Sequence, residues 1–122
     1  MGTRSDRSSW HIKFRVAGTR LVEAMRSHNS FHVHLLMAFL VMVLAIALNL
    51  PPWQWCALML SIGGVLTAEL FNTAMEELVR VIHPEVDPRI GRVLDIAAAA
   101  VLMASITAAI VGLIVLLPAL SS

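Results

Sequence analysis

Charge is scarce in this chain of 122 residues. Only 14% of the residues are Asp, Glu, Lys or Arg, compared with about 25% in soluble domains, whereas 58% are hydrophobic. The mean hydropathy is +0.80, so too little polar surface remains to cover a water-soluble globule of this size. The composition therefore argues against a soluble enzyme, a disordered tail and a nucleic-acid-binding module.

Cysteine and glycine-rich motifs are nearly missing as well. The single cysteine, Cys56, excludes an intrachain disulfide framework and a cysteine-rich zinc site. The chain contains no G-x-x-x-x-G-K-[ST] motif, which excludes a P-loop nucleotide site. Any phosphate bound by this chain must therefore be held by other cations or by a metal ion.

The charges that are present fall into two islands. The first 30 residues hold six basic and two acidic side chains, and residues 69–95 hold six acids and three arginines. The chain between these islands and the chain after Asp95 carry no formal charge. A spanning helix needs about 20 apolar residues, and Asn49-Leu50-Pro51-Pro52 divides the first gap because proline ends helices. We predict three transmembrane helices, over residues 32–48, 53–80 and 91–117.

Basic residues also predict the orientation. The N-terminal island carries six of them, the Asn49–Pro52 turn carries none, and the connection at residues 80–92 carries three. The positive-inside rule then places the N-terminus in the cytoplasm and the C-terminus outside, with the protein in the inner (cytoplasmic) membrane.

An amphipathic helix is predicted over residues 10–28, after a disordered tail at residues 1–9. Trp10, Phe14 and Leu21 recur at helical spacing among basic residues, which favours a helix lying on an anionic membrane face. This surface helix could be a topology anchor or could contribute to an active site.

Three polar residues stand together in the second predicted span. At 100° per residue, Glu69 and Glu76 lie about 20° apart and Asn72 lies about 60° from Glu69, so the three share one stripe. A charged side chain near the bilayer centre costs roughly 2.5–3.5 kcal/mol on insertion scales, which favours a functional role for Glu69. Glu77 fits the simpler interpretation of a solvated residue near the helix end.

Asp95 stands inside the third predicted span, just before a run of alanines. Helix-terminus electrostatics would account for an acid in the first turn. The alternative is that Asp95 and Glu76 converge on one carboxylate cluster near the cytoplasmic interface. Carboxylates with an amide nearby suit Mg²⁺, a hard ion that prefers oxygen ligands. A magnesium site at this interface would indicate phosphate chemistry.

Two segments carry a family resemblance. Ala68-Glu-Leu-Phe-Asn-Thr-Ala-Met-Glu76 and Asp95-Ile-Ala-Ala-Ala-Ala-Val-Leu102 resemble the motifs E-x-x-N-[ST]-A-x-E and D-x-x-[AS]-[AG]-A-V-L of the prokaryotic membrane diacylglycerol kinase and undecaprenol kinase family. The resemblance covers about residues 10–117 and implies a single all-α domain that assembles as a homotrimer. It also implies an enzyme that phosphorylates a lipid alcohol, diacylglycerol or undecaprenol, using ATP and Mg²⁺.

The resemblance assigns a role to each motif position. It implies that Glu69 is the general base for the lipid hydroxyl and that Asn72 positions the substrate or the γ-phosphate. Glu76 would hold the Mg²⁺ bound to ATP, and Asp95 would support the nucleotide.

Two positions depart from the family pattern. Leu94 stands where the family usually has a lysine for the nucleotide phosphates, and His28 stands where it has a metal-binding glutamate. Arg92 is our candidate for the missing cation, and His28 is our candidate for the second metal ligand. Other cations that could replace the lysine are Arg89, Arg80 and Lys13. His28 and His32 could share a metal across one helical turn, although neutral interfacial histidines are the simpler interpretation. His34 fits the undecaprenol kinase branch of the family.

Small residues suggest close helix packing. Ala100, Ala104, Ala108 and Gly112 repeat every four residues, a pattern that lets helices approach within a subunit or between subunits.

Two other functions remain open: an inactive relative that binds lipid or a membrane partner, favoured by Leu94 and His28, and a cation carrier. The carrier is disfavoured because the outer half of the predicted spans offers few polar side chains.

Overall fold

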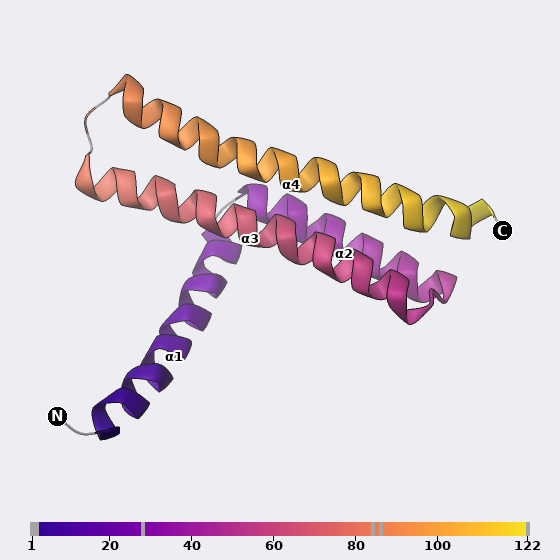
Figure 1. Cartoon of the computed structure of the whole chain (residues 1–122), viewed down its shortest axis with the longest axis horizontal. Helices are drawn as coiled ribbons and strands as arrows, with labels where there is room; N and C mark the ends of the chain where they lie inside the picture. Colours follow the sequence, from indigo (N-terminus) through magenta and orange to yellow (C-terminus); the bar gives the residue numbers. More distant parts are fainter. Residues whose placement is uncertain (1–2, 28, 84, 86, 122) are drawn as a thin grey trace.

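The computed structural model describes residues 3–27, 29–83, 85 and 87–121, and the fold in these ranges is helical. The helices are α1 (Thr3–Ser27), α2 (Asn29–Leu48), α3 (Pro52–Ile82) and α4 (Pro88–Ser121). Helices α2, α3 and α4 lie side by side, and α1 leaves this group at an angle (Figure 1). Each of α2, α3 and α4 is long and apolar enough to cross a membrane. The prediction of an all-α, multi-pass membrane protein with an N-terminal helix is confirmed.

The helix boundaries differ from the predicted ones by a few residues. Helix α1 begins at Thr3, so helix already covers most of the segment expected to be a disordered tail. Helix α4 begins at Pro88, three residues before the predicted start. Proline suits the first position of a helix because its fixed φ is helical and no intrahelical partner for its nitrogen is needed there. Helix α4 also continues past Pro118, where a single turn remains.

The turn between α2 and α3 is closed by backbone hydrogen bonds. The amides of Asn49 and Leu50 donate to the carbonyls of Ile46 and Ala45, at 3.2 and 3.5 Å. Asn49 has a φ of 57°, the left-handed conformation that ends many helices and that asparagine tolerates better than most residues. This arrangement buries Leu50 against Ala45, and Pro52 then starts α3.

The connection between α3 and α4 is organised by Asp87. Its Oδ1 accepts a hydrogen bond from the backbone amide of Arg89 at 2.9 Å, and its Oδ2 lies 3.2 Å from the guanidinium of Arg89. His83 Nε2 lies 3.8 Å from the same carboxylate. The side-chain and backbone hydrogen bonds from Arg89 hold the pKa of Asp87 below its ordinary value. Asp87 therefore caps α4.

The cap at Asp87 changes the interpretation of Asp95. The first turn of α4 holds no acidic residue, and Asp95 lies about two turns beyond Pro88. Helix-terminus electrostatics was an expected explanation for Asp95 and is wrong, because the start of α4 lies earlier than predicted and Asp87 occupies its cap.

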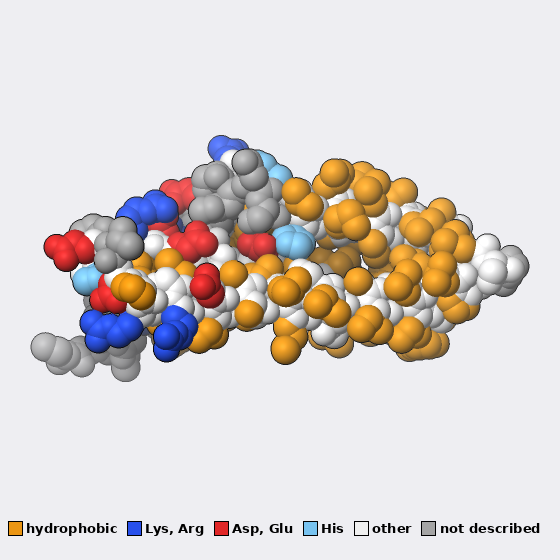
Figure 2. All heavy atoms as spheres, turned by 90° about the horizontal axis from the view of Figure 1, so that it is seen from above, with side chains coloured by type: hydrophobic (Ala, Val, Ile, Leu, Met, Phe, Trp, Pro, Cys, Tyr) orange, Lys and Arg blue, Asp and Glu red, His pale blue; other side chains and the backbone are white. Residues whose placement is uncertain are grey.

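Apolar packing and charge are separated along the molecule. The buried residues Ala45, Leu50, Leu58 and Val115 bring α2, α3 and α4 together near the α2–α3 turn. Figure 2 shows acidic and basic side chains gathered at the opposite end, with hydrophobic side chains covering the remaining length. The charged side chains are therefore concentrated at one end of the helices.

Candidate active site

Glu69 is the buried charged residue of the described part of the chain, with 3% of its surface exposed. Oε1 of Glu69 lies 3.0 Å from Nε2 of His34, so the contact joins α3 to α2. A carboxylate removed from water is tolerated when it is paired or hydrogen-bonded. The packing therefore places Glu69 inside the group of helices, as the apolar residues around it in the sequence predict.

Asn72 and Glu76 occupy the next turns of α3 on the same stripe. Asn72 donates from Nδ2 to Oε1 of Glu76 at 3.2 Å, and both side chains are half-buried. Oδ1 of Asn72 is buried and has no hydrogen-bond partner among the described residues. A buried acceptor without a partner is unusual in folded proteins. This site therefore offers one amide oxygen and one carboxylate to a hydrogen-bond donor or a metal ion.

A groove between α3 and α4 leads to the same asparagine. It has a volume of about 470 Å³, and its walls are almost entirely apolar. The groove exists because small residues of the two helices face it, among them Gly64, Ala68, Ala97 and Ala100. Asn72 is the polar member of its lining that also contacts Glu76.

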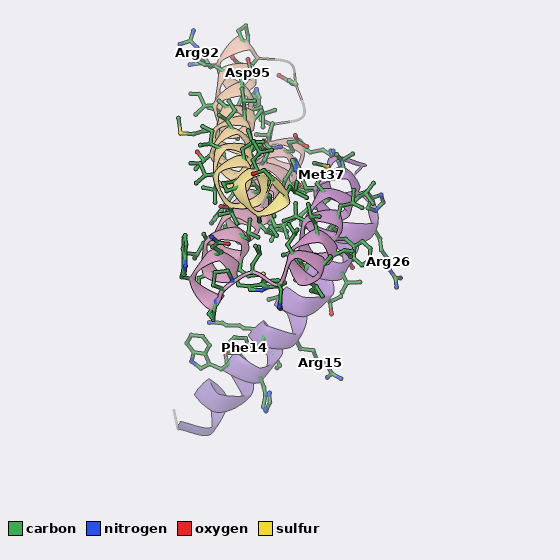
Figure 3. All side chains as sticks on the ribbon, turned by 90° about the vertical axis from the view of Figure 1, so that its right-hand side faces the viewer. Phe14, Arg15, Arg26, Met37, Arg92 and Asp95 are labelled. Atoms are coloured by element: carbon green, nitrogen blue, oxygen red, sulfur yellow. The ribbon has the colours of Figure 1, made fainter. Side chains whose placement is uncertain are left out.

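Asp95 and Arg92 lie near the start of α4. Both side chains are exposed, and Figure 3 shows them at the start of α4, on the opposite side of the molecule from Phe14 and Arg15 of α1. Leu94, between them, is half-buried. Helix α1 packs on α2 and α3, and no contact with α4 exists among the described residues. A single chain therefore does not bring its surface helix to the start of α4.

The convergence of Glu76 and Asp95 on one metal ion stays a prediction. Among the described residues, no three His, Cys, Asp or Glu side chains lie close enough to share a metal ion. His28, the second predicted metal ligand, lies outside the described residues. The donor set still fits Mg²⁺ bound to a nucleotide, because such an ion is commonly held by one or two carboxylates together with substrate phosphates. Glu76 and the amide oxygen of Asn72 supply oxygen donors of this kind.

Glu77 behaves as the sequence suggests. It is exposed and lies 3.1 Å from Arg80, one turn further along α3. An exposed pair of this kind contributes little to stability. Glu77 therefore has no place in the site and serves as a reference for the neighbouring Glu76.

His34 is the residue that the sequence reasoning left out of the site. A usable signal was present, because His34 and Glu69 stand at similar distances along the chain from the Asn49–Pro52 turn. In two antiparallel helices joined by a short turn, such residues reach the same depth. Counting residues from the turn along each helix would have placed His34 and Glu69 at a similar depth.

Sequence similarity to known proteins identifies the family of this chain. The model of the prokaryotic diacylglycerol kinase family matches residues 15–116. The chain is 31% identical over 117 residues to undecaprenol kinase from Bacillus subtilis, covering 96% of this chain and 95% of that protein. It is 33% identical over 112 residues to diacylglycerol kinase from Synechocystis sp., covering 91% of this chain and 64% of that protein. No solved structure matches the chain significantly. The chain belongs to the prokaryotic diacylglycerol kinase family, a family of lipid kinases.

Proposed function

We propose that this chain transfers the γ-phosphate of ATP to the hydroxyl group of a membrane lipid, with diacylglycerol and undecaprenol as the candidate acceptors. The observation that carries the proposal is the buried carboxylate of Glu69, which stands on the same helix face as the Asn72–Glu76 pair. Burial of a carboxylate in an apolar span is costly, and such residues are usually retained for function.

In the proposed reaction, Glu69 acts as the general base. The lipid oxygen forms a bond to the γ-phosphorus while the bond from this phosphorus to the β–γ bridging oxygen breaks. ADP leaves with the electron pair of that bond, and the hydroxyl proton passes to Glu69. Asn72 positions the reacting groups through its unpartnered amide oxygen.

The other polar residues would hold the nucleotide. Glu76 would bind the metal ion that accompanies ATP, and Mg²⁺ in this position would neutralise charge on the transferred phosphate. Asp95 would support the nucleotide on α4. Arg92 would supply the cation that Leu94 cannot, because it is exposed and lies three residues before Asp95, on the same face of the helix.

We further propose that the chain acts as a homotrimer with its N-terminus and the α3–α4 connection in the cytoplasm. A side chain added at Gly63, Gly64 or Gly112 would meet nothing within 4 Å in a single chain. Packing within the subunit therefore does not require these glycines, which supports a role for them between subunits. The basic residues of α1 support the orientation.

Phosphate transfer from radiolabelled ATP tests the proposal directly. Purified protein in mixed micelles with Mg²⁺ is offered diacylglycerol and undecaprenol in parallel. We expect label on one lipid, loss of label in Glu76→Gln, and full activity in the matched control Glu77→Gln. The labelled lipid identifies the acceptor.

Absence of label on both lipids, from folded and oligomeric protein, would overturn the kinase proposal. It would favour the second candidate, a relative that binds lipid or a membrane partner without phosphorylating lipid. Leu94 is the observation that favours this candidate, because it removes a cation from the nucleotide end.

A further inference from the structure

We infer that His34 is a positioning residue for this reaction, holding the carboxylate of Glu69 through Nε2 in the orientation in which it takes the proton of the lipid hydroxyl. The inference rests on the proposed function, because it assigns a role to a neighbour of the proposed base. It goes beyond that proposal by adding a residue of α2 to a site otherwise built from α3 and α4.

The geometry of the contact requires a proton between the two side chains. Nε2 of His34 and Oε1 of Glu69 are 3.0 Å apart, which is hydrogen-bond distance. An unprotonated imidazole nitrogen and an ionised carboxylate oxygen are both acceptors and would repel each other at this distance. In the form of Glu69 that can accept a proton from the lipid, His34 must therefore be the donor.

The two side chains differ in their contact with the surroundings. The side chain of His34 is 23% exposed, and that of Glu69 is 5% exposed. A carboxylate that water hardly reaches depends on protein donors to hold its ionised form. His34 supplies such a donor from the more open side of the contact.

The contact also fixes the direction in which the carboxylate points. Glu69 belongs to α3 and His34 to α2, so the packing of the two helices sets the rotamer of the base. General-base catalysis contributes about 10²–10⁴-fold to a rate, and it depends on placement of the base within hydrogen-bond reach of the proton. Loss of the His34 donor should therefore remove part of this rate enhancement and leave the affinity for ATP unchanged.

Two substitutions of nearly equal shape test the inference. His34→Gln keeps an N–H donor, and His34→Met has a similar length without one. Both variants lose the packing contacts of the imidazole ring, so a difference between them reports on the donor. We expect the kcat for lipid phosphorylation to fall about 10- to 100-fold in His34→Met and to stay within about threefold of wild type in His34→Gln. The KM for ATP should be unchanged in both. His11→Met is the matched control, because His11 is an exposed histidine on α1.

Each outcome separates this inference from the proposal beneath it. Equal kcat values in His34→Gln and His34→Met, in an active wild-type background, would overturn the role of His34 and leave the kinase standing. An equal loss in His11→Met would also overturn it, since the loss would then follow from the removal of any histidine. A wild-type protein that transfers no phosphate would remove both proposals together.

Discussion

Asn72 donates from Nδ2 to Oε1 of Glu76 at 3.2 Å, one turn further along α3. This hydrogen bond sets which way the amide faces, since its nitrogen is directed to the carboxylate. Its oxygen, which is buried, is left as an acceptor without a partner among the described residues. The pair therefore presents two oxygen donors from a single helix face.

The substitution Asn72→Leu should weaken the response to magnesium. Removing the amide frees Glu76 to change rotamer and removes one oxygen donor, and the loss of a residue that orients a metal ligand typically costs about 10- to 100-fold in metal affinity. We expect a rise of about tenfold in the Mg²⁺ concentration that gives half-maximal activity at fixed ATP. Thr107→Val, a change on the exposed face of α4, is the control. An unaltered Mg²⁺ dependence would contradict the role of this hydrogen bond.

The substitution Gly63→Leu should disturb assembly more than folding. Nothing lies within 4 Å of the position of an added Cβ in one chain, so the helix should form as before. If α3 packs closely against another subunit here, a leucine will hold the helices apart. Light scattering in detergent should then show fewer trimers, whereas Gly18→Leu on α1, where an added Cβ also meets nothing, should leave the distribution unchanged. Trimers of normal stability in Gly63→Leu would exclude this face from the interface.

The turn after α2 should accept glycine but not valine. Asn49 has a φ of 57°, which is strained by roughly 1–2 kcal/mol for an ordinary residue. Asn49→Val should lower the free energy of unfolding by about this amount because a β-branched side chain is unfavourable there, whereas Asn49→Gly should be close to neutral. Thermal unfolding followed by circular dichroism in detergent measures both. Equal losses in the two variants would contradict the left-handed conformation.

The free energy of unfolding should depend on pH through the ionisation of Asp87. Hydrogen bonds from Arg89 stabilise the ionised carboxylate, so its pKa is lower in the folded state than in the unfolded state. The stabilisation is therefore fully present at neutral pH and is lost as the pH falls through the lowered pKa, below about 4. Asp87→Asn keeps the cap and removes the charge.

We expect the small Tm difference between wild type and Asp87→Asn at pH 7 to shrink as the pH is lowered towards about 3. Melting curves of both proteins across this range measure the effect. A Tm difference that stays constant would mean that the charge of Asp87 contributes nothing to the fold.

The two ends of the helices should react with thiol reagents on opposite sides of the membrane. Pro51 lies in the charge-free turn and Glu85 in the connection beside Asp87, and both are exposed. In a Cys56→Ser background, Pro51→Cys should be labelled by an impermeant maleimide in intact cells. Glu85→Cys should be labelled only after the membrane is opened. The reverse pattern would invert the orientation derived from the basic residues.

Much of the fold could be predicted because a membrane imposes strong constraints on sequence. Every spanning segment must satisfy its own backbone hydrogen bonds, so long uncharged stretches become helices. The break at Asn49–Pro52 was located correctly for the same reason, since proline cannot continue a helix that precedes it. The start of α4 was placed too late because Asp87 and Pro88 form a cap that was read as part of the loop.

The candidate site was predictable only along α3. Glu69, Asn72 and Glu76 share a face through helical periodicity alone, so their order on the helix needed no knowledge of packing. The convergence of Glu76 with Asp95 was expected from their common membrane depth, but depth does not determine which way a side chain points. Asp95 is exposed on α4, and its convergence with Glu76 stays a prediction.

Local patterns were enough to predict the three spans, the charged end of the molecule and the polar stripe of α3, because each depends on residues close together in the chain. The contact of His34 with Glu69 becomes visible only when the helices are packed together, as does the buried oxygen of Asn72, which lies beside the α3–α4 groove without a hydrogen-bond partner among the described residues. These features arise from the rotation and depth of one helix against another. Such rotation is set by packing over the whole interface and not by any local pattern of residues.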